Sequence, residues 1–250
     1  MVETQIQYGI VKATPVLPVR DLLKVPHKSG ELVVGYPAFG PNTYLGNLAE
    51  MQKQYFHSAE QSGVSFKEPT TSESVSACAY DFEKLVKPQV LDPRWLQLGR
   101  ILRASRGIWA NLPKDAEGNL ITDESTLNQY LTKAQKIKVG NGHIYLGDND
   151  LGFAEYETFQ RGVQDCDTFA RGGLARLLEH TEEEVAKNLR EIASPKLYKK
   201  GVNVWGFDSV NEPISRVVSL GSLRGFDDDW LSVSGGYWSD NDNGYAFGVL

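Results

Sequence analysis

The sequence predicts a protein of the α+β class, because helical and strand-like segments are segregated along the chain. Helical spacing of apolar residues is confined to residues 42–193, and short strand-like segments precede and follow that region. Strand and helix do not alternate in the repeating way that builds a doubly wound or barrel fold. The chain has 250 residues, 41% of them hydrophobic, and no convincing linker, so we expect a single domain over residues 1–250.

Two strands and two helices are predicted in the first half of the chain. Residues 4–14 alternate apolar and polar side chains, and residues 31–39 form a second candidate strand. A helix is expected from Asn42 until Ser62 and Gly63 stop it, and its apolar face contains Tyr44, Leu48, Met51 and Tyr55. A second helix is expected to begin at a capping box that Thr70 forms with Glu73, ahead of Val75, Ala79, Phe82 and Leu85.

Further helices are predicted in the middle of the chain. Asp92 and Pro93 form an N-cap signal before a helix with the buried stripe Trp95, Leu98, Ile101 and Leu102. A polar helix over residues 124–137 precedes a hairpin, whose type I′ turn is signalled by Asn141 and Gly142.

The last hundred residues change from helical to strand-like. Residues 153–193 are predicted to be mostly helical, with a break at Gly172 and Gly173 and a restart at the capping box from Thr181 to Glu184. After Pro195 the helical period disappears, and short strands are expected at residues 202–207, 216–220 and 245–249, separated by long irregular runs.

Charge and composition exclude several classes of function. Residues 201–250 contain two basic and seven acidic residues, which places −5 of the total net charge of −6 in the last fifth of the chain. Nucleic acid would be repelled there, because binding it requires clustered Lys and Arg. No apolar run is long enough to span a membrane and residues 1–20 lack the pattern of a signal peptide, so we expect an unprocessed, soluble chain. Cys78 and Cys166 are expected to be reduced and buried.

The C-terminal window, residues 219–248, has the composition of a binding surface. Of its 30 residues, 22 are Gly, Ser, Asp, Asn, Tyr or Trp. Tyr and Trp supply large contact areas at low entropic cost, while Ser, Gly and Asn supply adaptable hydrogen bonds. A solvated acidic tail is the alternative. The aromatic residues Trp230, Tyr237, Trp238, Tyr245 and Phe247 argue instead for an ordered segment.

Three segments of this end resemble a known family: residues 217–222 (VVSLGS), 235–240 (GGYWSD) and 243–249 (NGYAFGV). They are similar to the branch of the C-type lectin fold that contains formylglycine-generating enzymes and the variable proteins of diversity-generating retroelements. In those variable proteins, Asn codons of the type AAY are mutated to NNY, which never encodes Lys, Gln, Glu, Met or Trp. Lys, Gln, Glu and Met are absent from residues 215–250, which fits this mechanism, and Trp230 and Trp238 would be unvaried scaffold.

The resemblance implies a fold, a function and a set of residues. The first and last strands of such a fold pair, so residues 6–11 would pair with residues 245–249. The protein would be a viral or prokaryotic, non-enzymatic binder of protein or cell-surface ligands, without cofactor or metal, and attachment to a virion or cell surface through another protein is one option. The variable region would be residues 216–248, with Trp205, Trp230, Trp238 and Phe247 as scaffold. Ligand-binding positions would be the polar or exposed aromatic residues Ser222, Arg224, Asp227, Asp228, Asp229, Ser232, Ser234, Tyr237, Ser239, Asp240, Asn241, Asp242 and Asn243.

Two other functions are open at this point. A calcium-dependent lectin would use the oxygen-rich runs at residues 148–150, 227–229 and 240–243, although their spacing does not match an EF-hand. A formylglycine-generating type of enzyme would need a cysteine pair near the C-terminus, and no cysteine follows Cys166. His27, His57, His143 and His180 lie in no recognisable metal or nucleophile motif, and Gly172 and Gly173 lack the context of a phosphate-binding loop. We therefore predict no catalytic residue.

Overall fold

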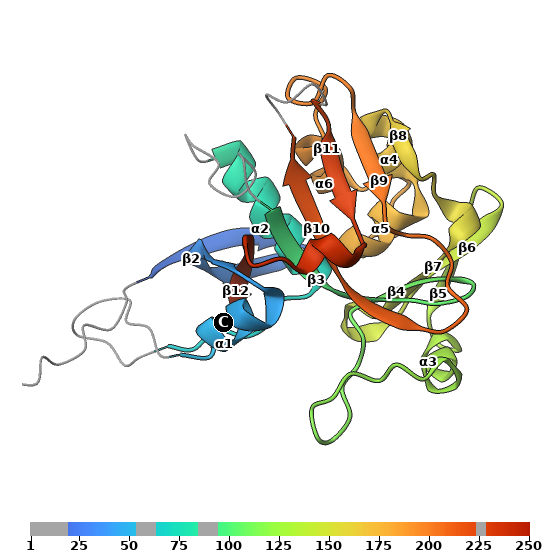
Figure 1. Ribbon diagram of the computed structural model, residues 1–250, viewed down its shortest axis with the longest axis horizontal. Coiled ribbons are helices and arrows are strands. Elements are labelled where there is room, and N and C mark those ends of the chain that lie inside the picture. Colours follow the sequence, from blue (N-terminus) through green and yellow to red (C-terminus); the bar gives the residue numbers. More distant parts are fainter. Residues whose placement is uncertain (1–19, 54–63, 85–94, 224–228) are drawn as a thin grey trace, which may run out of the picture.

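The computed structural model describes residues 20–53, 64–84, 95–223 and 229–250. Within these ranges the chain has one mixed sheet of twelve strands and six α-helices, so its class is α+β, as predicted (Figure 1). The strands are β1 Asp21–His27, β2 Gly30–Asn42, β3 Trp95–Arg103, β4 Gly107–Ala110, β5 Gln135–Val139, β6 Gly142–Leu146, β7 Gly152–Glu155, β8 Gly162–Gln164, β9 Val202–Trp205, β10 Ile214–Ser222, β11 Leu231–Ser234 and β12 Gly244–Val249. The helices are α1 Tyr44–Met51, α2 Thr71–Lys84, α3 Glu124–Leu131, α4 Cys166–Arg171, α5 Gly173–Glu179 and α6 Lys187–Ile192, with 3₁₀ turns η1 Asp148–Asp150, η2 Tyr156–Thr158 and η3 Tyr237–Asp240.

The sheet runs in the order β5-β6-β7-β4-β3-β10-β11-β9-β8, and a branch at β3 leads through β12 and β2 to β1. The pairings β11–β9 and β12–β3 are parallel, and the others are antiparallel. Strand β3 therefore contacts three neighbours, and it joins the β1–β2 hairpin to the rest of the sheet.

The helices form the second layer of the core. Helix α2 contacts α5, α6 and β1, and α4 to α6 lie together beside the β9–β11 part of the sheet (Figure 1). The capping box predicted at the start of α2 is confirmed: Thr70 N–H donates to the Glu73 carboxylate at 2.8 Å, and Glu73 N–H donates to Thr70 Oγ1 at 3.2 Å. Burial of the apolar faces of these helices contributes most of their stability, since helices of six to fourteen residues are marginal alone.

The C-terminal strand is confirmed, and the structure shows its partner. Strand β12 pairs antiparallel with β2 through Val249↔Val34 and Ala246↔Phe39. Residues 4–14, including the predicted partner strand at residues 6–11, lie outside the described residues. The predicted strand at residues 31–39 lies inside β2, whereas its hairpin partner β1 was not predicted.

Strand β3 corrects the prediction of a helix after Pro93. Six of its nine residues are buried and the other three are partly buried, and it is paired with β10 on one side and with β4 and β12 on the other. A strand with both faces covered is a nearly continuous apolar run, so apolar spacing cannot distinguish it from a buried helix.

The prediction of a mostly helical segment over residues 153–193 is wrong in its first third. Strands β7 and β8 occupy part of it, and helices begin only at Cys166. The break at Gly172 is confirmed, because α4 ends and α5 begins there. The restart at Thr181 is wrong: α6 begins at Lys187 with Ala186 as N-cap, and the Thr181 hydroxyl accepts the Glu183 N–H instead.

Smaller differences concern element ends and a turn. Helix α3 ends at Leu131 and β5 begins at Gln135, so the predicted helix over residues 124–137 is too long. The predicted hairpin is confirmed as β5–β6, but its turn residues are Gly140 and Asn141, with Gly140 at φ 57°. Strand β10 contains the predicted residues 216–220, and β9 confirms the strand at residues 202–205, whereas β11 was missed.

No helix in the described ranges is long and apolar enough to cross a membrane.

Candidate ligand-binding surface

Part of the C-terminal window is a buried section of the sheet, which corrects the expected exposure of three serines. Ser222 at the end of β10, and Ser232 and Ser234 in β11, are at most 6% exposed. Strand β11 is paired with β10 and β9 at its two edges, and all four of its residues are buried, so both of its faces are covered as well. The Ser232 hydroxyl accepts a hydrogen bond from Trp205 Nε1 at 2.7 Å, and therefore serves the interior.

The middle of the window is described only from Asp229 onward. Arg224, Asp227 and Asp228 lie outside the described residues. Asp229 is partly buried, and its backbone oxygen accepts the N–H of Lys200 at 3.2 Å. The Lys200 ammonium also lies 5.8 Å from the centre of the Trp230 ring. This stretch is thus anchored on residue 200, and Asp229 belongs to a connection between strands.

Four of the remaining predicted positions line one hollow on the molecular surface: Tyr237, Asp240, Asn241 and Asp242. The hollow has a volume of about 570 Å³ and is bordered by η3, by the segment at residues 240–242, by the start of α1 and by residues 215–217 of β10. Tyr237 is 77% exposed and Leu45 is 62% exposed. We call this surface the C-terminal face and define it as Tyr44, Leu45, Arg100, Ser215, Arg216, Val217, Tyr237, Asp240, Asn241 and Asp242.

Backbone contacts anchor the loop that carries the C-terminal face. The Asp240 carboxylate accepts the N–H of Tyr44, the first residue of α1, at 2.6 Å. The buried Asn47 amide donates to the backbone oxygen of Gly244 at 3.0 Å and to the side chain of Gln97 at 2.9 Å. A loop held at both ends by a buried helix and sheet keeps its geometry while its outward side chains change.

Asp242 and Asn243 are exposed, and their side chains make no hydrogen bond or ion pair with another described residue. Asn241 is partly buried and accepts the backbone N–H of Asn243 at 3.1 Å. Ser239 lies in η3, but its side chain is outside what the structure describes. The loop therefore presents Asp242 and Asn243 to solvent, and Asp240 is partly committed to holding α1.

The predicted scaffold residues have different environments. Phe247 in β12 is 1% exposed and belongs to the main core cluster. Trp205 and Trp230 are partly buried, and the Trp205 indole is bound to Ser232. The side chain of Trp238 is not among those described. Phe247 and Trp205 thus have interior contacts.

The floor of the hollow contains charged and ionisable groups that sequence reasoning missed. Burial raises the pKa of Tyr44, and the adjacent Glu68 raises it further, so the phenol stays protonated and donates to Glu68 at 3.3 Å. Arg100 reaches the hollow from β3 and Arg216 from β10. Each of these arginines interrupts an apolar run in the sequence, and this pattern could have indicated an exposed position on a strand. Leu45 lies off the apolar stripe that was predicted for its helix.

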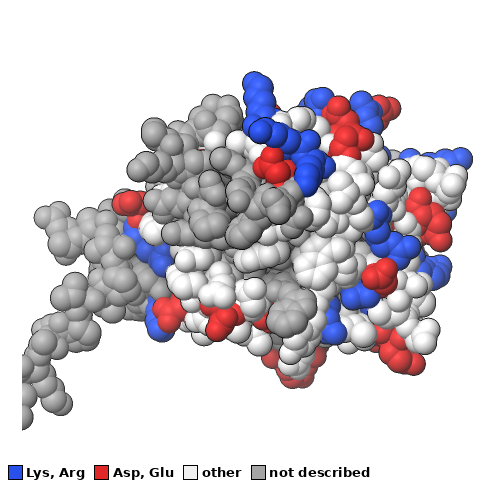
Figure 2. Space-filling view, turned by 45° about the horizontal axis from the view of Figure 1, so that its top comes forward, with Lys and Arg blue, Asp and Glu red and all other residues white. Residues whose placement is uncertain are grey.

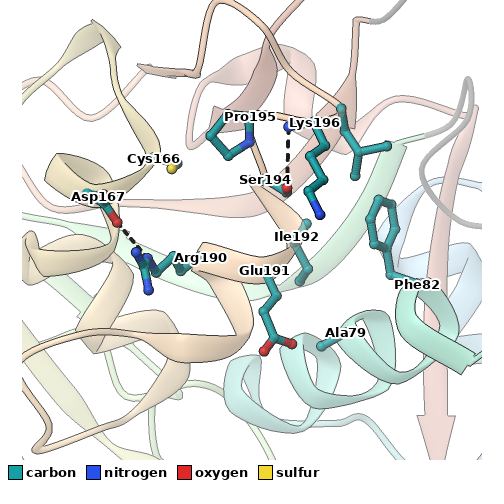
Figure 3. Close-up of a pocket in the computed structure, with 11 residues that line it drawn as sticks. Ala79, Phe82, Cys166, Asp167, Arg190, Glu191, Ile192, Ser194, Pro195 and Lys196 are labelled. Carbon is teal, nitrogen blue, oxygen red and sulfur yellow. Dashed lines mark hydrogen bonds and ion pairs between the residues drawn. The ribbon is translucent and has the colours of Figure 1, made fainter.

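A second cavity, of about 600 Å³, lies between α2 and α6 (Figure 3). Ala79 and Phe82 face Ile192 across it, and an ion pair at 2.5 Å joins Arg190 to Asp167 at its edge (Figure 3). No residue of the C-terminal window that the structure describes lines this cavity. Its thiol, Cys166, is a poor nucleophile, because burial and then the carboxylates of Asp167 and Asp165 raise its pKa.

The two cysteines are free and buried, as predicted. Burial also raises the pKa of the Cys78 thiol, which keeps it protonated. Among the described residues, no three His, Cys, Asp or Glu side chains converge so that they could hold a metal ion. On the face seen in Figure 2, basic and acidic side chains are interspersed over the described part, so that face carries no broad field of one sign.

Comparison with protein-family models, with curated proteins and with solved structures finds no match to this chain.

Proposed function

We propose that this protein is a non-enzymatic ligand-binding protein of the C-type lectin fold, and that its C-terminal face recognises another macromolecule, in the manner of retroelement variable proteins. The ligand class that fits best is a protein on the surface of a host or competitor cell. An enzymatic role has no comparable support, since both thiols are buried and protonated.

The observation that carries the proposal is the exposed pair Leu45 and Tyr237 at the rim of a hollow of about 570 Å³. Large apolar side chains in a soluble domain are usually buried, and an exposed aromatic residue beside a concave, polar-lined surface is typical of a binding site. Arg216, Asp240 and Asp242 supply polar groups of both signs around the pair. Such a mixed rim fixes the orientation of a ligand.

The arrangement of the terminal strands supports the C-type lectin assignment. Strand β12 closes against β2, so an early and a late part of the chain lie side by side (Figure 1). The helix α1 follows β2 directly and holds the loop of residues 240–244 through Asp240 and Asn47. A loop that is supported by the first part of the chain tolerates variation of its exposed side chains.

The proposed ligand contacts are a reduced set of the predicted positions. We retain Tyr237, Ser239, Asp240, Asn241, Asp242 and Asn243, together with Arg224, Asp227 and Asp228. Ser222, Ser232 and Ser234 leave the set because they are buried. Asp229 leaves it because it belongs to the connection that is anchored on Lys200. Leu45, Arg100 and Arg216 join it because they line the hollow.

Two matched libraries test the proposal. One library randomises Tyr237, Asp242 and Asn243 with NNY codons, and the control randomises the buried Ser222, Ser232 and Ser234 in the same way. We expect most members of the first library to fold and some to be selected for binding to an arbitrary protein target, whereas most members of the control library should unfold. Equal loss of folding in both libraries would contradict the displayed-surface function.

The surrounding DNA offers an independent test. An adenine-rich near-copy of the segment that encodes residues 216–248, next to a reverse transcriptase gene, is expected if the protein is diversified. Template adenines should fall at codons of exposed positions such as Asp242 and avoid those of Phe247 and Ser232. A template whose adenines coincide with buried positions would argue against the assignment.

A further inference from the structure

A smaller hollow adjoins the C-terminal face at the start of α2. It has a volume of about 310 Å³, and Lys67, Glu68, Arg100 and Lys114 supply its charged groups. Arg100 borders this hollow as well as the C-terminal face, so the two form one continuous surface. A ligand seated beside Tyr237 can therefore extend over Arg100 without leaving the protein.

The charge of the small hollow is opposite in sign to the net charge of the chain. Its lining contains three cations and the single carboxylate of Glu68. That carboxylate is shared: Lys114 Nζ lies at 2.8 Å and Arg100 Nη2 at 3.3 Å from its oxygens. The lining thus carries two positive charges in excess, in a chain whose net charge is −6.

Side chains, and not the helix terminus, produce this positive site. The N–H of Thr71 donates to Asn111 Oδ1 at 2.8 Å, and the N–H of Glu73 donates to Thr70 Oγ1 at 3.2 Å. Both amides at the start of α2 are therefore occupied. The Lys114 side chain is 48% exposed and the Arg100 side chain 25% exposed, so both remain within reach of a ligand.

We propose that the ligand of the C-terminal face is a protein that presents an acidic segment, and that Lys67, Arg100 and Lys114 receive its carboxylates. The inference rests on the proposed function, because it extends the same surface. A polypeptide offers carboxylates for the small hollow and an apolar side chain for Leu45 and Tyr237 at once, which a phosphate ion or a sulfated sugar does not. Glu68 acts as an internal competitor that occupies Arg100 and Lys114 in the free protein.

The test measures binding of a fluorescein-labelled oligoglutamate peptide by anisotropy at low salt, where surface charges are least screened. The double variant Lys67→Gln/Lys114→Gln should weaken binding about tenfold. Glu68→Gln should tighten binding several-fold, because it frees Arg100 and Lys114. The control Lys136→Gln/Lys138→Gln removes the same charge from exposed positions on β5 and should leave binding unchanged.

Several outcomes would overturn the proposal: no binding of the peptide, equal weakening by the two lysine pairs, or no gain from Glu68→Gln in a variant whose melting temperature is unaltered. Displacement of the peptide by inorganic phosphate or heparin at lower concentrations than by free oligoglutamate would also overturn the assignment to a protein. If the libraries select binders at Tyr237, Asp242 and Asn243 while the lysine variants change nothing, this inference fails and the proposed function stands.

Discussion

The chain contains two runs of the same three residues, Asp-Asn-Asp, at residues 148–150 and 240–242, and the two runs differ in burial and in hydrogen bonding. In the first run Asp150 is buried, and in the second Asp242 is exposed. Composition alone assigns both to a solvated loop or to an oxygen-rich cation site. The difference between the two runs shows that an acidic residue contributes to stability where distant segments supply its hydrogen-bond partners.

Asp150 is the centre of a buried polar cluster. Its side chain is 10% exposed, and it accepts hydrogen bonds from the Thr70 and Ser72 hydroxyls at 2.7 and 2.5 Å. Lys28 forms an ion pair with it, and His180 Nδ1 lies 3.5 Å away. The cluster ties the β1–β2 hairpin, the start of α2 and the end of α5 to one carboxylate.

The second run makes far fewer contacts. Asp240 accepts one backbone N–H, from Tyr44, and the side chain of Asp242 makes no hydrogen bond or ion pair with the described part of the chain. An acidic side chain without structural partners can be replaced at little cost in stability, which is what a variable recognition position requires.

The largest expected effect is that of Asp150→Ala. The substitution leaves the Thr70 and Ser72 hydroxyls without their acceptor, whereas the Lys28 side chain is 44% exposed and can be hydrated. It should therefore lower the free energy of unfolding by about 2–3 kcal/mol. Urea denaturation measures the change. The matched change Asp242→Ala in the second run is the control. Equal losses of unfolding free energy at the two positions would contradict the claim that Asp150, unlike Asp242, stabilises the fold.

The pH dependence of stability should report the same cluster. Burial opposes ionisation of Asp150, but the hydrogen bonds from Lys28, Ser72 and Thr70 outweigh it and lower its pKa from 3.8 to about 2. Because the folded pKa lies below the unfolded value, the stabilisation is fully present above pH ~4 and is lost as the pH falls toward 2. Between pH ~4 and pH ~2, the free energy of unfolding should fall less steeply with pH for Asp150→Asn than for the parent. Urea denaturation at several pH values measures this dependence, and an equal dependence in the two proteins would contradict the role given to Asp150.

A middle-sized effect is expected at the buried serines of the window. Ser232→Ala removes the acceptor of Trp205 Nε1 and should cost about 1 kcal/mol. Ser222→Ala is the matched case: its hydroxyl is buried and has no hydrogen-bond partner among the described residues, so the change should be neutral or slightly stabilising. Thermal unfolding of the two variants measures the difference, and the reverse order would show that Ser232 is not a structural residue.

The smallest effects are expected on the C-terminal face. Asp240→Ala should cost about 1 kcal/mol or less, since it removes one acceptor at the start of α1. The combined change of Tyr237, Asp242 and Asn243 to Ser should stay within about 0.5 kcal/mol per position. Calorimetry checks both. A combined loss as large as that of Asp150→Ala would mean that the loop is part of the core.

Sequence reasoning found those elements whose signals are local. The start of α2 at Thr70 was found because a capping box needs only residues three positions apart, and β12 was found because an apolar terminal run must be covered. Strand β3 was missed because burial on both faces removes the period of two that marks a strand. Its spacing of Trp95, Leu98 and Ile101 matches a helix by coincidence.

The candidate site was predicted in part. Tyr237, Asp242 and Asn243 were expected to be exposed, and they are. Ser232 and Ser234 were grouped with them because serine is frequent in turns and loops, and β11 was not recognised. Arg100 and Lys114 lie far from the window along the chain, and no local pattern connects them to it.

The sequence by itself determined the α+β class, the acidic C-terminal fifth and the abundance of Gly, Ser, Asp and aromatic residues in the window. These are properties of composition and of short-range spacing, which do not depend on contacts between distant segments. The tertiary structure decided which members of that window are buried, which acidic run became a structural centre, and which cations border the C-terminal face. Those outcomes depend on pairings such as β12 with β2 and Asp150 with Lys28, because burial and charge pairing arise only where distant segments meet.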